Sequence, residues 1–439
     1  MPLPLHRPLL TTTIVSAMLL AGCVGTPDTD VSSSSAEAIS SSEAPSISSA
    51  SSEAASSSSA PAISSSSEAV ESSSSEAQAS SSSEADLTVM VKTGSILDTE
   101  DTAKMCTNRD MRQTADLTEA QYITLQSNAD NTITEEGVYV VSGNVTNATI
   151  IIEALDEDAK VQLVLQDVTV INQDSPAIYV KAADKVFVTS VGQNHLEVTG
   201  AYVPDGETNL DAVIFSRDDI TLNGTGNLTV ISAQGNGVTS KDDLKVTGST
   251  ITLTSQLDSL EANDSIRICG GDMTINTQKD GLHSENDDDD SLGYIFISGG
   301  SMHITAVDDA VRATSVIQMD GGNIVVPTSY EGMEATYLQF NGGMIDVYSR
   351  DDGINATAKS TAYPIMIEVN DGMLYVEVGS GDTDCFDSNG DIYVNGGYIS
   401  VTGNSAFDRD GTAVFNGGTV YVNGTQVTTL PGMGGGRGF

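Results

Sequence analysis

Beyond residue 136 the chain alternates short apolar runs with polar and turn residues, and the same order returns about every 22 residues. A five-residue phrase marks each return: an acid, a small residue, an apolar residue, any residue, and then Ala or Ser. Its six copies begin at Asp258, Asp280, Asp309, Glu331, Asp352 and Asp384. The copies start 22, 29, 22, 21 and 32 residues apart, which indicates one basic repeat with two loop insertions. A period of this length is typical of stacked structural units.

Each repeat also contains two short alternating strands joined by a glycine pair. The run Ile266–Cys269 leads into Gly270 and Gly271, and the run Met273–Asn276 follows them. The same order recurs at Gly299, Gly321, Gly342, Gly396 and Gly417. Glycine accepts backbone angles that other residues resist, which suits a corner between strands. Together with the phrase, this pattern predicts about three short strands in each coil.

Three strands per coil, a fixed period and no long amphipathic helical pattern predict an all-β fold, a right-handed parallel β-helix. In such a fold the alternating apolar side chains fill the interior and the outward side chains stack in columns. We expect the third and fifth residues of the phrase to point inward and the fourth to point outward, with the leading acid at the turn. Asn341, Asn395 and Asn416 at equivalent turns suit a ladder of amides between coils. A nonapeptide calcium roll would need Gly-Gly-x-Gly-x-Asp every nine residues, and that spacing is absent.

The N-terminus predicts export. Residues 1–22 resemble a lipoprotein signal peptide, because an apolar stretch behind Arg7 ends in Leu-Ala-Gly directly before Cys23, whose thiol would carry the lipid. A plain secretory signal is the alternative. The apolar stretch is shorter than the ~20 residues that a membrane-spanning helix needs. We therefore expect an exported lipoprotein held at the outer membrane or cell surface by its lipid anchor, with the domain outside the cell.

Composition divides the rest of the chain. Residues 23–85 follow the lipidated Cys with Ser, Ala and Glu almost throughout, which predicts a disordered linker. Residues 86–136 do not follow the repeat, and we expect an N-terminal cap with a short helix within Asp98–Arg112 that covers the open end of the stack. The repeats occupy residues 137–424. A Gly-rich tail completes the chain over residues 425–439.

Charge restricts the partners. The chain has 61 acidic residues against 18 Lys plus Arg, a net charge of −43, which excludes nucleic acid as a natural partner. An anionic polymer could bind only through cations. With no Trp and 5% aromatic residues, the chain is poorly supplied for the flat aromatic platform that holds neutral crystalline glucans.

The acids of the phrase point to a metal. Coils stack about 4.8 Å apart, so like charges in register repel by about 3.5 kcal/mol at an effective dielectric constant of 20. Such a column needs compensating cations or protonated members. The acids are doubled at Asp308–Asp309 and Asp351–Asp352, and Asp384 is followed by Asp387. Clusters of hard carboxylate oxygens suit Ca²⁺ better than Zn²⁺. The alternative is that the acids form turns and keep the surface soluble.

Seven segments of the chain carry a family resemblance: Ala159–Leu165, Ala177–Val188, Ile214–Gly226, Ser240–Val246, Glu285–Asp290, Ser329–Glu334 and Asp352–Ala356. They resemble the bacterial carbohydrate-binding domain family of calcium-dependent parallel β-helix lipoproteins, over about Gly137 to Gly424. The resemblance implies binding of cell-wall polysaccharide, notably acidic, pectin-like chains, and similarity to polysaccharide lyase β-helices.

Carried over residue by residue, the resemblance implies nine calcium ligands: Asp280, Asp308, Asp309, Glu331, Glu334, Asp351, Asp352, Asp384 and Asp387. The sequence departs from the Asp-Gly pattern of the family at Ser259, Ala310 and Cys385, where a side chain restricts the backbone.

The resulting hypothesis is calcium-dependent binding of acidic, uronate-containing polysaccharide by a surface-tethered monomer, without catalysis. Tyr330, Arg350 and Asn355 are the expected sugar contacts. One alternative is a pectate-type lyase in which Lys279, Arg312 or Arg350 removes a proton that Ca²⁺ has acidified. Each of these cations has a simpler interpretation as a partner of adjacent carboxylates. A second alternative is a surface adhesin in which calcium is purely structural.

The remaining Cys and His residues add little. Cys269 and Cys385 lie about five coils apart, near 24 Å, which is beyond disulfide reach. Cys106 can therefore pair with at most one of them, and buried free thiols are the default expectation. The histidines, His195, His283 and His303, lie on different coils without a ligand pattern, so we expect neither a zinc site nor His-based catalysis.

Overall fold

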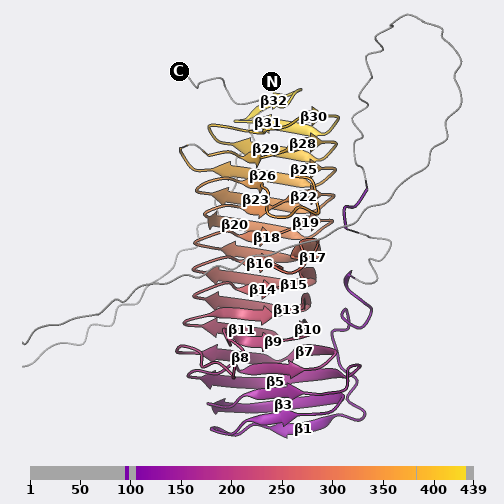
Figure 1. Ribbon diagram of the computed structural model, residues 1–439, viewed down its shortest axis with the longest axis vertical. Coiled ribbons are helices and arrows are strands. Elements are labelled where there is room, and N and C mark those ends of the chain that lie inside the picture. The colour runs from indigo at the N-terminus through magenta and orange to yellow at the C-terminus, as the bar shows by residue number, and fades with distance from the viewer. Residues whose placement is uncertain (1–93, 98–104, 382, 432–439) are drawn as a thin grey trace, which may run out of the picture. The chain divides into compact units, whose positions relative to one another are not determined.

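The computed structural model describes residues 94–97, 105–381 and 383–431. Every described residue belongs to one compact unit, Ala85–Phe439. This unit is a column of stacked strands (Figure 1). The predicted signal peptide, lipidated Cys and Ser-rich linker lie outside the described residues, and the described residues contain no helix long and apolar enough to cross a membrane.

Two sheets make up the column. The larger contains 21 strands. These are β1 Gln121–Thr124, β3 Gly137–Thr146, β5 Lys160–Asn172, β7 Lys185–Val191, β8 Gln193–Val198, β10 Asp219–Gly224, β11 Asn227–Ser232, β13 Asp243–Ser255, β15 Ser265–Thr277, β17 Tyr294–Thr305, β19 Val316–Met319, β20 Asn323–Ser329, β22 Tyr337–Phe340, β23 Met344–Ser349, β25 Met366–Val369, β26 Met373–Val378, β28 Asp391–Val394, β29 Tyr398–Thr402, β30 Ala413–Phe415, β31 Thr419–Val422 and β32 Thr425–Val427.

The smaller sheet contains 11 strands. These are β2 Asn131–Ile133, β4 Ile150–Glu153, β6 Ile178–Ala182, β9 Ala212–Ser216, β12 Asn236–Ser240, β14 Leu260–Ala262, β16 Leu282–Ser284, β18 Val311–Ala313, β21 Met333–Ala335, β24 Ile354–Ala356 and β27 Phe386–Ser388. Each copy of the repeated phrase contributes its last three residues as one strand of this sheet. These six strands are β14, β16, β18, β21, β24 and β27.

Strand register confirms the parallel stacking of the repeats. The third residues of the phrase pair in succession, Leu260 with Leu282, Leu282 with Val311, and so on to Phe386. Each of these side chains is fully buried, and the small fifth residues are buried with them, as predicted. One continuous hydrophobic cluster extends from Leu125 in the first coil to Val420 in the last. Removal of this apolar surface from water drives the coils to stack.

Glycine forms the corner where the larger sheet bends. In β15 the register shifts between Cys269 and Asp272. Gly271, inside this corner, has φ of +91°, and a Cβ there would lie 2.6 Å from the carbonyl oxygen of Gly248 in the preceding coil. Only glycine meets both conditions, which explains the recurring glycine pair. The adjacent turn carries the predicted amide ladder: the side-chain amide of Asn416 donates to Asn395 at 2.8 Å, Asn395 to Asn370, and Asn370 to Asn341.

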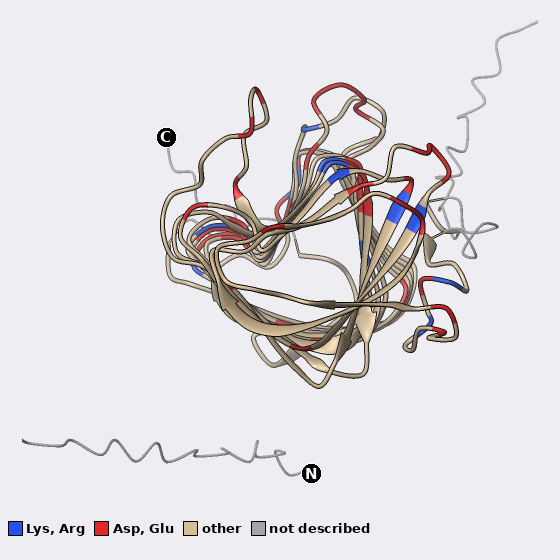
Figure 2. Ribbon diagram, turned by 90° about the horizontal axis from the view of Figure 1, so that it is seen from below, with Lys and Arg blue, Asp and Glu red and all other residues tan. Residues whose placement is uncertain are grey.

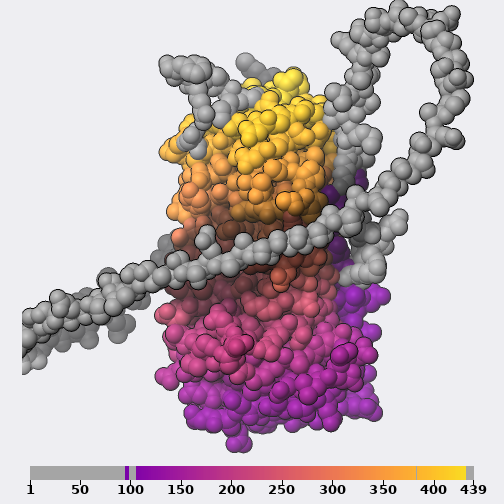
Figure 3. All heavy atoms as spheres, viewed as in Figure 1, coloured from indigo at the N-terminus to yellow at the C-terminus, as the bar shows by residue number. Residues whose placement is uncertain are grey.

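The ends of the stack differ from the expected boundaries. Parallel pairing begins at β1 and β2, before residue 137, and β32 pairs antiparallel with β31 after residue 424, which covers the free edge of the last strand. The described part of residues 86–120 lies along a flank of the column rather than across its end, and Figures 1 and 3 show this indigo segment at one side of the stack. Its polar side chains find partners on the flank, as described below.

The cysteines also differ from expectation. Cys106 and Cys269 form a disulfide that fastens this flanking segment to β15, so free thiols were the wrong default for these two residues. Cys385 is a buried free thiol. The predicted helix within Asp98–Arg112 falls partly outside the described residues, and residues 107–111 form a turn in which the Met111 amide donates to the Thr107 carbonyl.

Candidate functional site

The acids of the repeated phrase share one column on the outside of the smaller sheet. Viewed along the stack, several acidic positions superimpose in a tight group at the left of the section, and further acidic positions lie on loops around it (Figure 2). In the first coils the equivalent positions hold Ala148, Pro176 and Ala212, and the polar column begins at Asn236. We call the following set the acid face: the leading residues Asp258, Asp280, Asp309, Glu331, Asp352 and Asp384, and the fourth-position residues Glu261, His283, Arg312, Glu334, Asn355 and Asp387.

Four of the six leading acids also bind the backbone of the next coil. The Asp258 carboxylate accepts a hydrogen bond from the Asp280 amide at 3.0 Å, and that of Asp280 accepts from the Asp309 amide at 2.9 Å. Asp309 likewise accepts from the Glu331 amide at 3.2 Å, and Asp352 accepts from the Asp384 amide at 2.8 Å. The ladder therefore uses one carboxylate oxygen for folding. The sequence alone does not predict that these acids accept backbone hydrogen bonds.

Cations neutralise one half of the acid face. Lys279 Nζ lies 2.7 Å from Asp258, and His283 Nδ1 lies 3.2 Å from the same carboxylate. Arg312 lies 3.7 Å from Glu334, whose other cationic neighbour, Lys359, is at 2.8 Å. Lys279 and Arg312 thus pair with adjacent carboxylates, which is the simpler of the two roles predicted for them.

Crowding raises the pKa values of the acids that form the centre of the column. Burial, reinforced by the charge of Asp258, raises the pKa of Asp280 to about 6. Burial and neighbouring acids raise the pKa of Asp309 to about 7 and that of Glu331 to about 8. The same causes raise the pKa of Asp352 to about 7. The charge repulsion predicted for an in-register column is therefore present, and a bound cation would relieve it.

Four groups of three potential metal ligands lie on or beside the acid face, each with ligand atoms within 4.8 Å of one another. They are Asp258/Asp280/His283, Asp280/Asp308/Asp309, Asp309/Glu331/Glu334 and Asp384/Asp387/Asp408. The groups include seven of the nine predicted ligands. Asp351 and Asp352 belong to none of them, although Asp352 is part of the ladder. Asp258, His283 and Asp408 belong to groups but were not among the predicted ligands.

The donor atoms of the three all-oxygen groups fit a calcium ion. Ca²⁺ takes six to eight hard oxygen ligands in flexible geometry. The face also contains buried oxygens that have no hydrogen-bond partner, Asp280 Oδ2 and Asn355 Oδ1. The group with His283 does not fit, because that imidazole lies between carboxylates. Burial alone would lower the pKa of His283, but the hydrogen bond and charge of Asp258 outweigh it and raise the pKa, which favours a protonated ring that cannot bind a metal.

The predicted sugar contacts fall into two places. Tyr330 is 45% exposed, and the Arg350 guanidinium lies 5.8 Å from its ring centre, so these two form one exposed pair. Arg350 Nε also donates to the Ser329 carbonyl. Asn355 instead lies in the column itself, where its amide donates to Glu331 at 3.0 Å.

A hollow of about 520 Å³ adjoins the His283 end of the acid face. Its walls include Lys241, Glu261 and His283 on one side and residues 285–288 on the other. Residues 285–288 belong to the loop that lengthens the interval between Asp280 and Asp309 to 29 residues. This insertion therefore raises a wall beside the column.

A family model and a curated relative indicate the same family. A family model described as "Carbohydrate-binding domain-containing protein" matches residues 127–384. A protein of Acetivibrio thermocellus with the same description is 41% identical over 198 residues, which cover 44% of this chain and 69% of that protein. A solved structure, of the polysaccharide lyase-like protein from C. thermocellum as a gadolinium derivative, aligns with 28% identity and a TM-score of 0.44, over 51% of this chain and 92% of that chain.

Proposed function

This chain belongs to the family of carbohydrate-binding domain-containing proteins, and from that premise we propose that its acid face binds an acidic, uronate-containing polysaccharide through calcium. The observation that carries this proposal is the in-register column of carboxylates whose pKa values are raised by burial and by one another. A site of this charge repels an anionic sugar chain unless a divalent cation lies between them.

The three all-oxygen groups would hold the calcium. Bound Ca²⁺ would supply positive charge and open coordination positions for the carboxylates of a uronate chain. The protein's own groups then position the sugar. Tyr330 offers an exposed ring and Arg350 a guanidinium beside it, while the hollow next to His283 is large enough for a sugar residue.

The finer architecture and location belong to the same proposal. We propose that the stacked coils wind as a right-handed parallel β-helix, which carries the acid face along its axis. We also propose that lipidation at Cys23 and the Ser-rich linker hold this unit at the cell surface, where pectin-like cell-wall chains are accessible.

Binding to immobilised polygalacturonate tests the proposal. The protein should be retained with 1 mM calcium and released by a chelator, and a neutral polymer such as cellulose should not retain it. The double variant Asp384→Asn/Asp387→Asn should lose at least tenfold in affinity. The charge-neutral control is Asn404→Ala, outside the acid face, which should bind like the wild type. Retention that is unaffected by chelator would contradict the proposal.

Catalysis is not part of the proposal, because Lys279 and Arg312 are engaged with carboxylates. A lyase would release unsaturated sugar products that absorb ultraviolet light. Incubation with polygalacturonate and calcium should produce no such absorbance. Absorbance that disappears in Lys279→Ala would instead establish the lyase alternative.

A further inference from the structure

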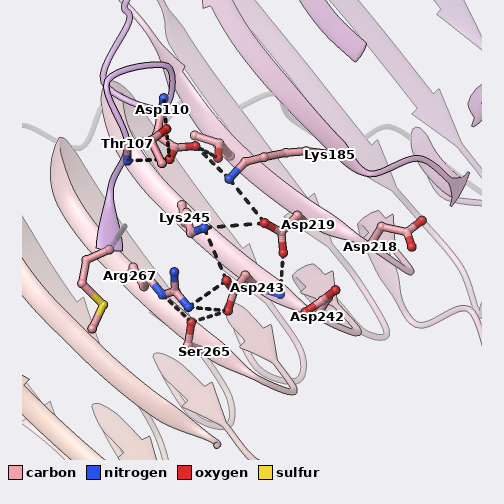
Figure 4. Close-up of polar contacts among 12 residues, drawn as sticks. Thr107, Asp110, Lys185, Asp218, Asp219, Asp242, Asp243, Lys245, Ser265 and Arg267 are labelled. Atoms are coloured by element: carbon pink, nitrogen blue, oxygen red, sulfur yellow. Dashed lines mark hydrogen bonds and ion pairs between the residues drawn. The ribbon is translucent and has the colours of Figure 1, made fainter. Parts of the chain in front are cut away.

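The flanking segment, residues 105–113, covers a second polar site on the larger sheet. We call this segment the strap. It contacts β7, β10, β13 and β15 of the larger sheet, and Figure 4 shows its residues Thr107 and Asp110 beside Lys185. The acid face belongs to the smaller sheet. The central residue of the strap is Asp110, whose side chain is completely buried.

An ion pair and several hydrogen bonds hold the carboxylate of Asp110, as they would hold a bound ligand. Its Oδ1 lies 2.9 Å from Lys185 Nζ and accepts a hydrogen bond from the Thr221 hydroxyl at 2.8 Å. Its Oδ2 accepts from the amide and the hydroxyl of Thr107, both at 2.7 Å. Asn223 donates to the Asp110 backbone carbonyl at 3.2 Å. Lys185 and Thr221 come from the stack, so the stack itself provides the partners of Oδ1, whereas Thr107 of the strap provides those of Oδ2.

The receptor is part of a row of buried cations. Lys185 and Lys245 share Asp219 at 3.4 and 3.6 Å, and Lys245 and Arg267 share Asp243 at 3.3 and 2.8 Å (Figure 4). The two lysines are no more than 8% exposed. A chain with 18 Lys and Arg against 61 acids therefore buries two lysines and partly buries Arg267 in one row. Burial of cations is costly without anionic partners, so a carboxylate at Lys185 stabilises the row.

The same row includes groups that suit a sugar. Phe187, Thr221, Lys245, Arg267 and Phe296 are in register on successive strands, so they form one column along the flank. Aromatic rings provide apolar surface for sugar rings, hydroxyls pair with sugar hydroxyls, and cations form charge-assisted hydrogen bonds with carboxylates. The strap already occupies the aromatic part of this column, because the Arg109 guanidinium lies 4.5 Å from the centre of the Phe187 ring.

We propose that this flank is a second, calcium-independent binding site for the carboxylate of a uronate-containing sugar chain, and that Asp110 occupies it as an internal stand-in ligand. The choice of a uronate rests on the function proposed above, whereas the carboxylate site itself rests on the contacts of Asp110. The ligand and the strap compete for the site.

Two attachments hold the strap on the flank, and they determine how strongly it competes with a ligand. The Cys106–Cys269 disulfide fastens one end of the strap. At the other end the Gln113 side chain donates to the Thr247 carbonyl at 3.0 Å and accepts from the Gly224 amide at 3.0 Å. A tethered ligand competes at high effective concentration. The apparent affinity of the site for free sugar is therefore the intrinsic affinity multiplied by the fraction of molecules whose strap is released. The wild type with an intact disulfide should therefore bind through this site only weakly.

Chemical rescue tests the receptor with the disulfide intact. Asp110→Gly removes the internal carboxylate, and its melting temperature should be below that of the wild type. In the presence of a chelator, galacturonate should raise the melting temperature of Asp110→Gly by about 2 °C or more, whereas glucose at equal ionic strength should not. The wild type and Asp110→Gly/Lys185→Met should not respond. No selective rise in Asp110→Gly, or an equal rise in the Lys185→Met background, would overturn the proposal.

Proteolysis tests the displacement. In the full chain carrying Cys106→Ser and Cys269→Ser, a released strap exposes Arg109 and frees the backbone at Arg109 and at the already exposed Arg112 for cleavage by trypsin. With chelator present, oligogalacturonate should accelerate cleavage at these sites several-fold, and a neutral cello-oligosaccharide should leave the rate unchanged. An unchanged or slower rate with oligogalacturonate would contradict the competition. Because the chelator silences the acid face, failure of either experiment is distinguishable from failure of calcium-dependent binding. The rescue experiment remains decisive if the cysteine variant does not fold.

Discussion

At the scale of single residues, four of the six leading acids combine two roles that substitution can separate. One carboxylate oxygen accepts a hydrogen bond from the backbone of the next coil, as Asp309 does from Glu331. The charge of the same group contributes to the acid face. Asn236 occupies the same column and accepts the Asp258 amide at 2.9 Å through its side-chain oxygen. An amide therefore supports the ladder without the charge.

Asp309→Asn and Asp309→Ala should consequently change the free energy of unfolding in opposite directions. Without calcium at pH 8, Asp309→Asn should raise the free energy of unfolding by about 1 kcal/mol, because it removes a charge that neighbouring acids repel and keeps the ladder. Asp309→Ala should be about 1–3 kcal/mol less stable than Asp309→Asn, because the Glu331 amide loses its acceptor. Denaturant unfolding in chelator measures both. Equal stability of the two variants would refute the structural role of the carboxylate.

The raised carboxyl pKa values predict an unusual dependence of stability on pH. Asp280, Asp309, Glu331 and Asp352 have pKa values of about 6 to 8 in the folded chain, above the ordinary carboxyl value. Protonation of these groups therefore favours the folded state. Their contribution is complete below about pH 4 and is lost as pH rises toward 8, by at most about 1.4 kcal/mol per pH unit for each group.

In chelator, the melting temperature should therefore fall between pH 5 and pH 8, and 1 mM calcium should reduce that fall. A series of thermal melts across this range, with and without calcium, provides the measurement. The opposite case is Asp110, because Lys185 and the strap hydroxyl outweigh burial and lower its pKa to about 2. The stability that Asp110 contributes is lost only in strong acid, so it does not obscure the fall in melting temperature between pH 5 and pH 8. A chelated protein whose melting temperature rises over pH 5–8 would contradict the burial of the column.

Sequence reasoning identified most of the acids but not all of their surroundings. The repeated phrase included Asp258, yet the resemblance transferred ligands only from Asp280 onward. The histidines show no ligand pattern among themselves, so their positions alone predict no role for His283. The register of the strands places it one coil from Glu261 and Arg312, between carboxylates of the column. Register, which the 22-residue period already defines, was the signal that would have revealed these contacts.

At the scale of elements, the corners of the later coils require glycine for two separable reasons. Gly322 has φ of +90°, and a Cβ there would lie 2.9 Å from the Gly299 carbonyl oxygen of the preceding coil. Gly206 has φ of +61° but no heavy atom within 4 Å of the Cβ position. The two residues thus share backbone strain and differ in the approach of the neighbouring coil.

Gly322→Ala should therefore destabilise the fold by about 2–4 kcal/mol and Gly206→Ala by about 1 kcal/mol. Denaturant unfolding of both variants measures the difference. Equal losses would show that the φ value alone accounts for the glycine and that the close approach between coils is unimportant.

The strap is the element that the sequence could not place. It has no repeat and few apolar residues, and its attachment depends on a disulfide between residues 163 positions apart. Cys106→Ser/Cys269→Ser should lower the free energy of unfolding by about 2–5 kcal/mol, because closure of so long a loop restricts the unfolded chain. Cys385→Ser, at the buried free thiol, is the matched control and should leave the strap in place. A double variant as stable as the wild type would show that polar contacts alone hold the strap.

At the scale of the whole molecule, the period of the sequence determined the parallel stack. Apolar third residues and small fifth residues had to face the core once the coils were 22 residues long, and the structure confirms this from Leu260 to Phe386. The stack also begins earlier than the repeats in the sequence, because β1 and β2 form the first coil without the acidic phrase. The periodic part of the fold was therefore predictable, whereas the flank and the ends depend on contacts between distant residues that no period describes.

If stacking concentrates carboxylates into a column that retains calcium, equilibrium dialysis of the full chain against 1 mM calcium, followed by metal analysis, should detect the bound ion. The wild type should retain calcium, and Asp309→Asn/Asp384→Asn/Asp387→Asn, which keeps the backbone ladder, should retain less. Calcium contents that are equal in the two proteins, or no retention by the wild type, would contradict calcium binding by the column.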